Sequence, residues 1–257
     1  MILGIDVGNT NIVIGCIDDK KIHFVGRIST DCNKTQTQYA IDFNNVLKLY
    51  EIDKNEITGS IISSVVPQLI TILNQAIEAV TGKSPLVVGP GVKTGLNILI
   101  DNPAQLGSDL VVDAVAAISQ YTPPLVIIDM GTATTISVID KKCNYRGGVI
   151  LPGVRISQDA LSSRTSQLPY INLEAPKKVI GVNTIECMES GVIYGNSSMI
   201  DGIVDRIEEE LNDKVTVIAT GGLSTKIVPY CKNKIICDDN LLLKGLFIIY
   251  EKNKPKN

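Results

Sequence analysis

Short apolar runs rich in β-branched residues open each half of the chain, and longer stretches with helical periodicity follow them. Residues 1–5 and 125–128 are the first of these runs, and each ends in an Asp-x-Gly turn. Two more short runs follow in each half, over residues 11–17 and 21–28 in the first and residues 134–139 and 146–150 in the second. Such runs, bounded by Gly, Asn or Asp, predict three strands joined by tight turns.

Helices and further strands are predicted after each group of three strands. Tyr39, Phe43 and Leu47 recur at helical spacing. A second periodic segment begins at Pro67 and stops before Gly82, which suits a helix with proline in its first turn. The charged residues 252–257 are expected to fray. The other predicted elements are strands over residues 60–66 and 215–219 and helices over residues 184–211, 223–230 and 240–250.

The two halves of the chain repeat each other. Residues 5–10, Ile-Asp-Val-Gly-Asn-Thr, are echoed by residues 128–132, Ile-Asp-Met-Gly-Thr, and the strand after each motif is echoed as well. Matching flanks in the same order indicate an internal repeat. A meander of three strands, then alternating helix and strand, is the order of a ribonuclease-H-like half. We therefore predict an α/β protein of two ribonuclease-H-like halves in tandem, residues 1–120 and 121–257, with mixed sheets flanked by helices and a cleft between the halves.

Composition and charge exclude several classes of protein. The 257 residues carry 24 Lys and Arg against 27 Asp and Glu, a net charge of -3, whereas binding to nucleic acid needs basic residues in excess. The longest apolar runs fall far short of the roughly 20 residues of a membrane span. The first residues lack the basic flank of a signal peptide. We therefore expect a cytoplasmic protein that binds neither nucleic acid nor a membrane.

The cysteines and the one histidine form no recognisable metal or catalytic motif. The six cysteines include no CxxC pair, and no histidine stands at ligand spacing from them. That favours reduced, mostly buried thiols over a zinc or redox site. His23 lies in an alternating strand pattern without a second histidine, so a Ser-His-Asp triad is set aside.

The two Asp-x-Gly turns are candidate phosphate-binding sites. Gly8 and Gly131 have no Cβ, so the backbone can approach an anion closely and offer successive N–H groups. Asp6 repels phosphate but can bind it through Mg²⁺ or a water on that ion. A plain hairpin turn is the alternative for either copy alone. Two equivalent copies facing one cleft favour the phosphate site.

Three other stretches carry candidate chemistry. Thr220-Gly-Gly222 follows a predicted strand and opens a helix, so its backbone either lies close to a ring or ribose or simply joins the two elements. The glycine-rich residues 147–153 combine a strand with a turn and are expected near the interface of the halves. Ser108 is a natural helix cap with Asp109 in the first turn. There a carboxylate either accepts the proton of an attacking hydroxyl or only offsets the helix dipole.

Taken in order, these motifs resemble those of type III pantothenate kinases, within the sugar kinase, chaperone and actin superfamily. The resemblance covers nearly the whole chain, and its specificity lies in the ordered set of motifs. The motifs are Asp6-Val-Gly-Asn-Thr10, Lys93-Thr-Gly95, Asp101-Asn-Pro103, Gly107-x-Asp109, Asp129-x-Gly-Thr132, Gly181-x-Asn-Thr184 and Thr220-Gly-Gly222.

The resemblance implies ATP-dependent phosphorylation of pantothenate to 4'-phosphopantothenate, the first step of coenzyme A biosynthesis. It implies Asp109 as the proton acceptor, Mg²⁺ at Asp6, a K⁺ or NH₄⁺ ion at Asp129, and a homodimer with sites near the subunit interface. The first half would hold the phosphate-binding turn and the acceptor segment, and the second the cation site and the nucleotide-binding glycines. The implied ATP contacts are Asp6, Val7, Gly8, Asn9, Thr10, Asn11, Ile12, Val13 and Thr132, and the implied substrate contacts are Gly107, Ser108, Asp109, Leu110 and Thr184.

Two positions depart from the family pattern. Leu110 stands where the family usually has Arg after the catalytic Asp, and Ile100 stands where it usually has Tyr. Replacing Arg by Leu removes up to five hydrogen-bond donors and a charge from the acceptor pocket, for which Arg155 or Arg164 can compensate. Two alternatives therefore stay open: a diverged kinase for another small hydroxylated acid, and a non-catalytic nucleotide-binding regulatory protein.

Overall fold

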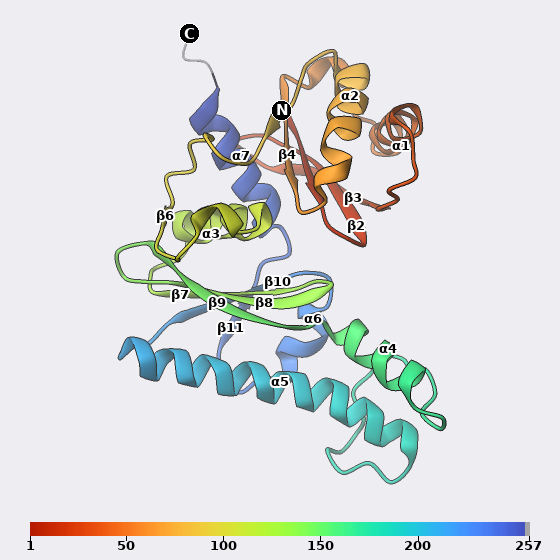
Figure 1. The fold of residues 1–257 in the computed structure, drawn as a ribbon, viewed down its shortest axis with the longest axis vertical. Helices are drawn as coiled ribbons and strands as arrows, with labels where there is room; N and C mark the ends of the chain where they lie inside the picture. The colour runs from red at the N-terminus through yellow and green to blue at the C-terminus, as the bar shows by residue number, and fades with distance from the viewer. Residues whose placement is uncertain (255–257) are drawn as a thin grey trace. The chain divides into compact units, whose positions relative to one another are not determined.

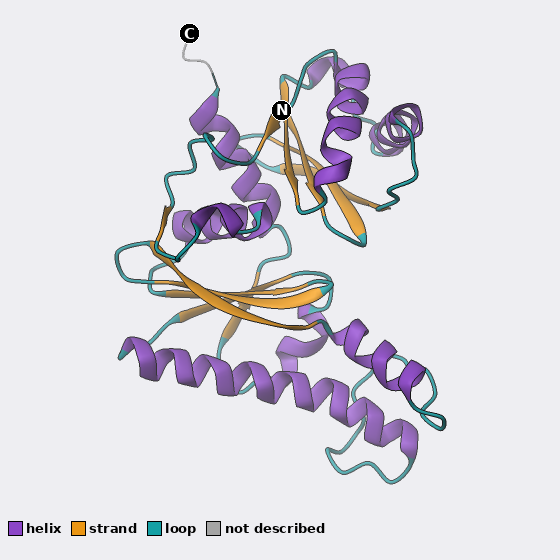
Figure 2. Cartoon of the chain, in the orientation of Figure 1, coloured by secondary structure: helices purple, strands orange, loops and turns teal. Residues whose placement is uncertain are grey.

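The computed structural model describes residues 1–254, and the chain forms two compact units (Figures 1 and 2). Unit 1 contains Met1–Leu96, Asp101–Ser119 and the residues from Asn240 onward, and unit 2 contains Asn97–Ile100 and Gln120–Asp239. Residues 255–257, the end of the charged tail, lie outside the described residues. Each unit is built on one mixed sheet with helices beside it, drawn orange and purple in Figure 2.

The sheet of unit 1 has the strand order β3-β2-β1-β4-β5. The first three strands form the predicted antiparallel meander, and β1 pairs in parallel with β4, which pairs in parallel with β5. These strands are β1 (Ile2–Val7), β2 (Asn11–Ile17), β3 (Ile22–Ser29), β4 (Gly59–Ser64) and β5 (Leu86–Val87).

Side-chain alternation along β1 divides its residues between two buried faces. Leu3, Ile5 and Val7 pack in one core cluster with the helices α1 (Gln36–Leu49) and α2 (Ile70–Thr81). Ile2 packs in a second cluster with α3 (Ser108–Gln120) and α7 (Leu241–Asn253). Because side chains two positions apart share a face of a strand, Asp6 lies on the α3 and α7 face of the sheet.

Local signals mark the start of α1 and both ends of α2. Thr35 caps α1 in a reciprocal capping box with Gln38. Pro67 begins a short 3-10 turn, Pro67–Leu69, that leads into α2, and α2 ends at Gly82 with a φ of 70°.

The sheet of unit 2 repeats that of unit 1. Its strand order is β11-β10-β7-β8-β9-β6, with β7, β8 and β9 as the antiparallel meander and β10 parallel to β7. The helix α5 (Thr184–Leu211) matches the predicted bounds and packs with α4 (Val154–Arg164) and α6 (Ser224–Ile227). The strands are β6 (Asn97–Ile98), β7 (Leu125–Met130), β8 (Ala133–Ile139), β9 (Asn144–Pro152), β10 (Thr216–Thr220) and β11 (Ile235–Cys237).

The repeat is therefore structural as well as sequential. The strands β7, β8, β9, β10 and β11 occupy the positions of β1, β2, β3, β4 and β5, and β6 is added at one edge. This confirms the prediction of two ribonuclease-H-like halves with mixed sheets and flanking helices.

Some segments differ from the sequence prediction. The last helix, α7, packs on β1, β4 and β2 of unit 1, although it follows the second half in sequence. The strand β6 pairs with β9 and so belongs to unit 2. The helix α4 was not predicted, because most of its 11 residues are polar and show no clear apolar face. The two- and three-residue strands were not predicted, because they are too short to show a period.

The cysteines are less buried than expected. Cys16 is fully buried, and burial raises the pKa of its thiol to about 12. Cys32, Cys187 and Cys237 are exposed, so the expectation of mostly buried thiols is wrong.

Candidate active site

The β1–β2 turn carries the first candidate phosphate site. Asp6 is the second-last residue of β1, and only 9% of its surface is exposed. The Gly8 N–H donates to the Asn11 carbonyl at 3.0 Å and closes the hairpin, and a Cβ at residue 8 would lie 3.2 Å from that oxygen. The side chain of Thr30 donates to the Gly8 carbonyl at 2.7 Å and holds the turn against β3.

The predicted ATP contacts in this turn fall into two groups. Val7 and Ile12 are fully buried in the core, so only their backbone can serve a ligand. Val13 is half-buried. The side chains that are exposed at this turn are those of Asn9, Thr10 and Asn11.

The acceptor segment begins α3 and holds Asp109 in a confined position. Its Oδ1 accepts from the Leu110 N–H at 2.8 Å. Burial raises the pKa of the Asp109 carboxyl above its ordinary value, although two backbone hydrogen bonds oppose the shift. A Cβ at Gly107 would overlap Asp109 Oδ1, so a side chain at residue 107 would displace the carboxylate.

Hydrogen bonds connect this segment to the strand beside Asp6. In the parallel pair of β1 and β4, Asp6 is registered with Ser63. The Ser63 hydroxyl lies 3.0 Å from the Ser108 hydroxyl, and the Ser108 hydroxyl also bonds to the backbone of Ser64. The prediction that Ser108 caps α3 is wrong, because its hydroxyl bonds to Ser64 at the end of β4 and not to a backbone N–H of the helix. Unit 1 thus joins the strand end that carries Asp6 to the helix start that carries Asp109.

The second Asp-x-Gly turn lies between β7 and β8 of unit 2. The Gly131 N–H donates to the Ala133 carbonyl at 3.1 Å, so this turn is one residue shorter than the turn that Gly8 and Asn11 close in unit 1. Thr132 is exposed, and Gly153 lies so close to its carbonyl that a Cβ there would overlap the oxygen. The glycine-rich residues 147–153 therefore end against this turn, within unit 2.

The Thr220-Gly-Gly222 turn lies against Asp129. Gly221 has a φ of 89°, and a Cβ there would lie 2.5 Å from Asp129 Oδ1. Both conditions require glycine. The registers place Thr220 of β10 and Thr135 of β8 beside Asp129, and Thr135 Oγ1 is buried without a hydrogen-bond partner within residues 1–254. A carboxylate and a buried hydroxyl oxygen are the kind of donors that hard cations such as K⁺ accept, so these residues fit a cation at Asp129.

Thr184 lies at the start of α5 and lines a pocket of about 550 Å³ in unit 2. The Asn183 side chain caps the helix by accepting from the Glu186 N–H at 3.0 Å. The rest of the pocket is mainly apolar and comes from α4, α5 and the segment between them, with the lining residues Ser157, Leu161, Leu168, Cys187, Met188, Gly191, Val192 and Asn196.

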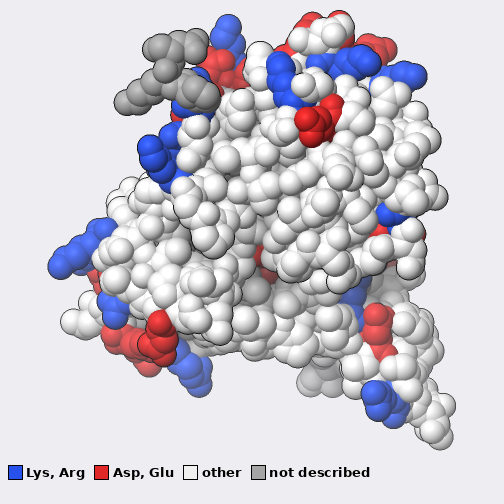
Figure 3. Space-filling view, turned by 45° about the horizontal axis from the view of Figure 1, so that its top comes forward, with Lys and Arg blue, Asp and Glu red and all other residues white. Residues whose placement is uncertain are grey.

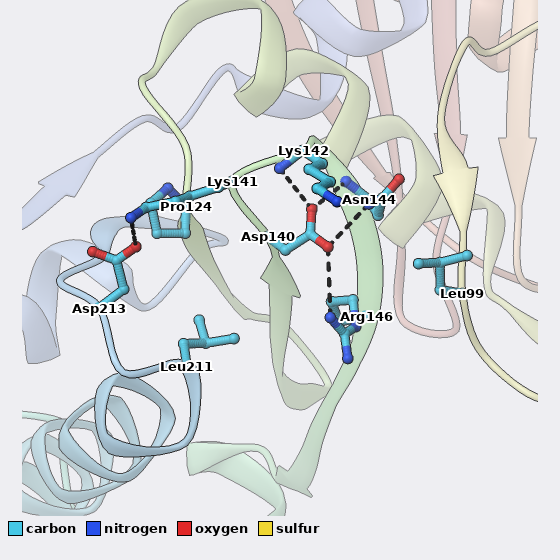
Figure 4. A pocket seen from close by; sticks show the side chains of 9 residues that line it. All are labelled: Leu99, Pro124, Asp140, Lys141, Lys142, Asn144, Arg146, Leu211 and Asp213. Atoms are coloured by element: carbon cyan, nitrogen blue, oxygen red, sulfur yellow. Dashed lines mark hydrogen bonds and ion pairs between the residues drawn. The ribbon is translucent and has the colours of Figure 1, made fainter.

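A second pocket of unit 2, of about 390 Å³, contains none of the predicted site residues (Figure 4). Its two carboxylates already have partners. Asp140 accepts from the backbone of Lys142 and Asn144 at 2.8 and 2.9 Å, and Asp213 pairs with Lys141 at 2.5 Å. These contacts lower the pKa values of both carboxyls, for Asp140 against the effect of burial. The two carboxylates of this pocket therefore stabilise local structure through bonds to neighbouring residues.

The two departures from the family pattern lie in different units. Leu110 follows Asp109 on α3 in unit 1 and is half-buried. Ile100 belongs to unit 2, where its Cγ2 would lie 3.9 Å from a Cβ at Gly147.

Ser63 and Thr135 lie beside Asp6 and Asp129 in strand register, but neither was predicted. Neither lies in a motif, and each reaches its aspartate only through strand register. An alternating pattern gives the face of a side chain, but not the residue opposite it.

The surface and the helices add two observations about partners. On the face drawn in Figure 3, basic and acidic side chains are interspersed. Among the helices of residues 1–254, none combines the length and the apolar character that crossing a membrane requires.

With this geometry in place, the chain can be compared with known proteins. A family model described as type III pantothenate kinase matches residues 2–206. Type III pantothenate kinases of an Exiguobacterium species and of Halalkalibacterium halodurans are 46% and 44% identical to this chain, over 99% and 98% of it and 100% of each relative. A solved structure described as a Baf family transcriptional activator from Campylobacter jejuni is 20% identical and has a TM-score of 0.61, with 98% of both chains covered.

The repeated sheets with an aspartate turn in each place this protein in the class built from two ribonuclease-H-like halves, the sugar kinase, chaperone and actin superfamily. The likeness to the Campylobacter jejuni structure supports the fold alone. Within that class, the chain belongs to the type III pantothenate kinase family.

Proposed function

We propose that this chain phosphorylates the primary hydroxyl of pantothenate with ATP as donor, giving 4'-phosphopantothenate and ADP in the first step of coenzyme A biosynthesis. Its membership in the type III pantothenate kinase family over nearly its whole length supports this reaction. The structural observation that carries the proposal is the link in unit 1 between the end of β1 at Asp6 and the start of α3 at Asp109, made by Ser63 and Ser108.

Asp109 is the proton acceptor in this proposal. Phosphoryl transfer depends mainly on positioning and on neutralising charge, and a carboxylate orients the attacking hydroxyl and takes its proton. Burial raises the pKa of Asp109, which makes its carboxylate a stronger base than an exposed one. The Leu110 N–H holds one of its oxygens, Oδ1.

Asp6 and the β1–β2 turn serve the nucleotide. When bound, Mg²⁺ with ATP supplies the phosphoryl group and offsets the charge that develops on it. The buried Asp6 would hold the metal or one of its waters, and the exposed side chains of Asn9, Thr10 and Asn11 would contact the phosphates. Thr132 is proposed as a further ATP contact, and Thr184 as a substrate contact, both from the family resemblance.

Asp129 is the proposed ligand of the monovalent cation. The support is the donor set of unit 2: the Asp129 carboxylate lies against Gly221, and the buried Thr135 hydroxyl lies opposite it in register. K⁺ coordinates several oxygen atoms and NH₄⁺ donates hydrogen bonds to them, so either ion suits such a set.

We also propose that two copies of the chain form a homodimer through an apolar surface of unit 2. Several exposed large side chains come from the end of β9, from α4, from the start of α5 and from the segment between these helices. Figure 1 shows where these elements lie in unit 2. Clustered apolar exposure marks interaction sites. We call this set the apolar surface; it consists of Ile150, Ile156, Leu161, Tyr170, Val179, Ile180, Val182 and Ile185.

The reaction is tested directly with the purified full chain. With MgATP, KCl and pantothenate, we expect ADP release that depends on pantothenate, with 4'-phosphopantothenate identified by its mass. Turnover only with another small hydroxylated acid would replace pantothenate as the acceptor, and Leu110 in place of Arg is the observation that favours this outcome. ATP binding without turnover on any acceptor would overturn the kinase assignment.

A further inference from the structure

We infer that Ser108 is a positioning residue that fixes the Asp109 carboxylate relative to the strand end at Asp6, and that its hydroxyl does not contact the acceptor. The inference rests on the proposed role of Asp109 as proton acceptor. It concerns a side chain whose family role is implied only by its place in the Gly107–Leu110 segment.

The hydroxyl of Ser108 uses its whole hydrogen-bonding capacity inside unit 1. It donates to the Ser64 carbonyl at 3.0 Å and accepts from the Ser64 N–H at 3.0 Å. Since its one proton goes to that carbonyl, the third bond, 3.0 Å from Ser63 Oγ, is donated by the Ser63 hydroxyl. A serine hydroxyl has one proton and two lone pairs, so no bond remains for a substrate.

These three bonds attach the first turn of α3 to the end of β4. Ser63 is fully buried and registered with Asp6 in the parallel pair of β4 and β1. Asp109 is the next residue after Ser108. The hydroxyl network therefore sets the distance between the strand that would hold the metal–nucleotide and the carboxylate that would accept the proton.

The other side of the Asp109 carboxylate is bounded by Gly107 and Leu110. The Leu110 N–H holds Oδ1 at 2.8 Å, and a Cβ at residue 107 would occupy the same space as that oxygen. These contacts orient the carboxylate on α3 but do not attach the helix to the sheet. The Ser108 network attaches this end of the helix to the end of β4.

The test is a set of variants of the full chain assayed with MgATP, KCl and pantothenate. We expect Ser108→Ala to lower kcat by about 10- to 100-fold, because small displacements of reacting groups have effects of that size. The KM values should stay within about twofold, since no substrate contact is removed. Ser108→Thr keeps the hydroxyl and should restore most of kcat. Ser119→Ala removes a hydroxyl from the other end of the same helix, where it donates to the Ala116 carbonyl at 2.7 Å, and should leave kcat unchanged.

A double variant separates positioning from general stability. If Ser108 acts through Asp109, then Ser108→Ala should change kcat by less than about twofold once Asp109→Asn is present, because the two residues act as a unit. A loss that persists at full size in the Asp109→Asn background would overturn the inference. So would a Ser108→Ala enzyme with wild-type kcat, or one in which the KM for pantothenate rises while kcat is unchanged.

The Ser63→Ala variant and the wild-type assay decide the cases that Ser108→Ala alone leaves open. If Ser108→Ala fails to fold, as judged by circular dichroism, Ser63→Ala takes its place, because it removes one of the three bonds and leaves both bonds to Ser64. A smaller loss of kcat supports the inference, and no loss overturns it. A wild-type chain without turnover on pantothenate would reject the proposed function together with this inference, whereas an active wild type with an unaffected Ser108→Ala would reject the inference alone.

Discussion

Burial opposes the negative charge of the Asp109 carboxylate. The activity of the enzyme should therefore depend on pH. Burial raises the pKa of this carboxyl, so protonation inactivates the base at a higher pH than for an exposed aspartate. We expect kcat/KM for pantothenate to fall on the acid side with an apparent pKa above the ordinary aspartate value. A pH profile of the wild type measures it, and a profile that is flat down to the ordinary value would contradict it.

Replacing Asp109 by Asn should separate chemistry from folding. Asp109→Asn should lower kcat by about 10²- to 10⁴-fold, the usual contribution of a general base, while the Kd for ATP stays near the wild-type value. Asp19→Asn, an exposed turn position, is the matched control.

The same substitution has a predicted effect on stability. A raised pKa in the folded state stabilises the fold below the unfolded pKa, and this contribution is lost as the pH rises through the folded pKa. The difference in the free energy of unfolding, Asp109→Asn minus wild type, should therefore be more positive at pH 7 than at acidic pH, which means that the variant gains stability relative to the wild type as the pH rises. Urea titrations at both pH values measure it, and the opposite trend would contradict the burial of this carboxyl.

Gly221 offers a test of the cation site at the residue scale. Gly221→Ala forces a Cβ to within 2.5 Å of Asp129 Oδ1 at a φ of 89°, so the carboxylate must move. We expect weaker activation by K⁺ and a loss of roughly 1 kcal/mol or more in the free energy of unfolding. Gly222→Ala is the control, because a Cβ there meets no atom within 4 Å. If both variants respond to K⁺ as the wild type does, Asp129 is not the cation ligand.

At the scale of elements, α3 and α7 cross closely on the face of the sheet that Asp6 shares. A Cβ at Gly245 would overlap the Val112 carbonyl oxygen, which is backbone and cannot turn away. We expect Gly245→Ala to lower the free energy of unfolding by about 1–3 kcal/mol, as overpacking does. Gly195→Ala in α5 has open space around it and should instead gain about 0.5–1 kcal/mol from helix propensity. Urea unfolding compares the two, and equal effects would contradict the close crossing.

For the whole molecule, the apolar surface predicts the oligomeric state. Val182 and Ile180 are 84% and 82% exposed, and a pair of aspartates there would leave two charges from each copy inside the proposed interface. We expect the wild type to sediment at twice the 27.7 kDa chain mass, and the Ile180→Asp/Val182→Asp variant as a monomer. Leu49→Asp, at a 75% exposed position of unit 1, should remain a dimer. A wild type that is monomeric at micromolar concentration would contradict the proposal.

Much of the fold and part of the site follow from local patterns. The Asp-x-Gly repeat predicted two equivalent sheets, because a hairpin turn and its flanking strands depend mainly on neighbouring residues. The bounds of α5 were predicted to the residue, since a helix of 28 residues shows many periods. Asp6, Asp109 and Asp129 were predicted as site residues from the motifs they occupy, and their roles stay predictions.

Long-range packing decided the rest. Residues far apart in sequence meet only when strands pair and helices dock, so no local pattern placed α7 on the first sheet or β6 beside β9. Strand register alone put Ser63 beside Asp6 and Thr135 beside Asp129. Which carboxylates and turns the protein has follows from local sequence, because those features depend on nearby residues. Which hydroxyls lie beside the carboxylates follows from long-range packing, because contacts between distant segments depend on the register in which those segments pair.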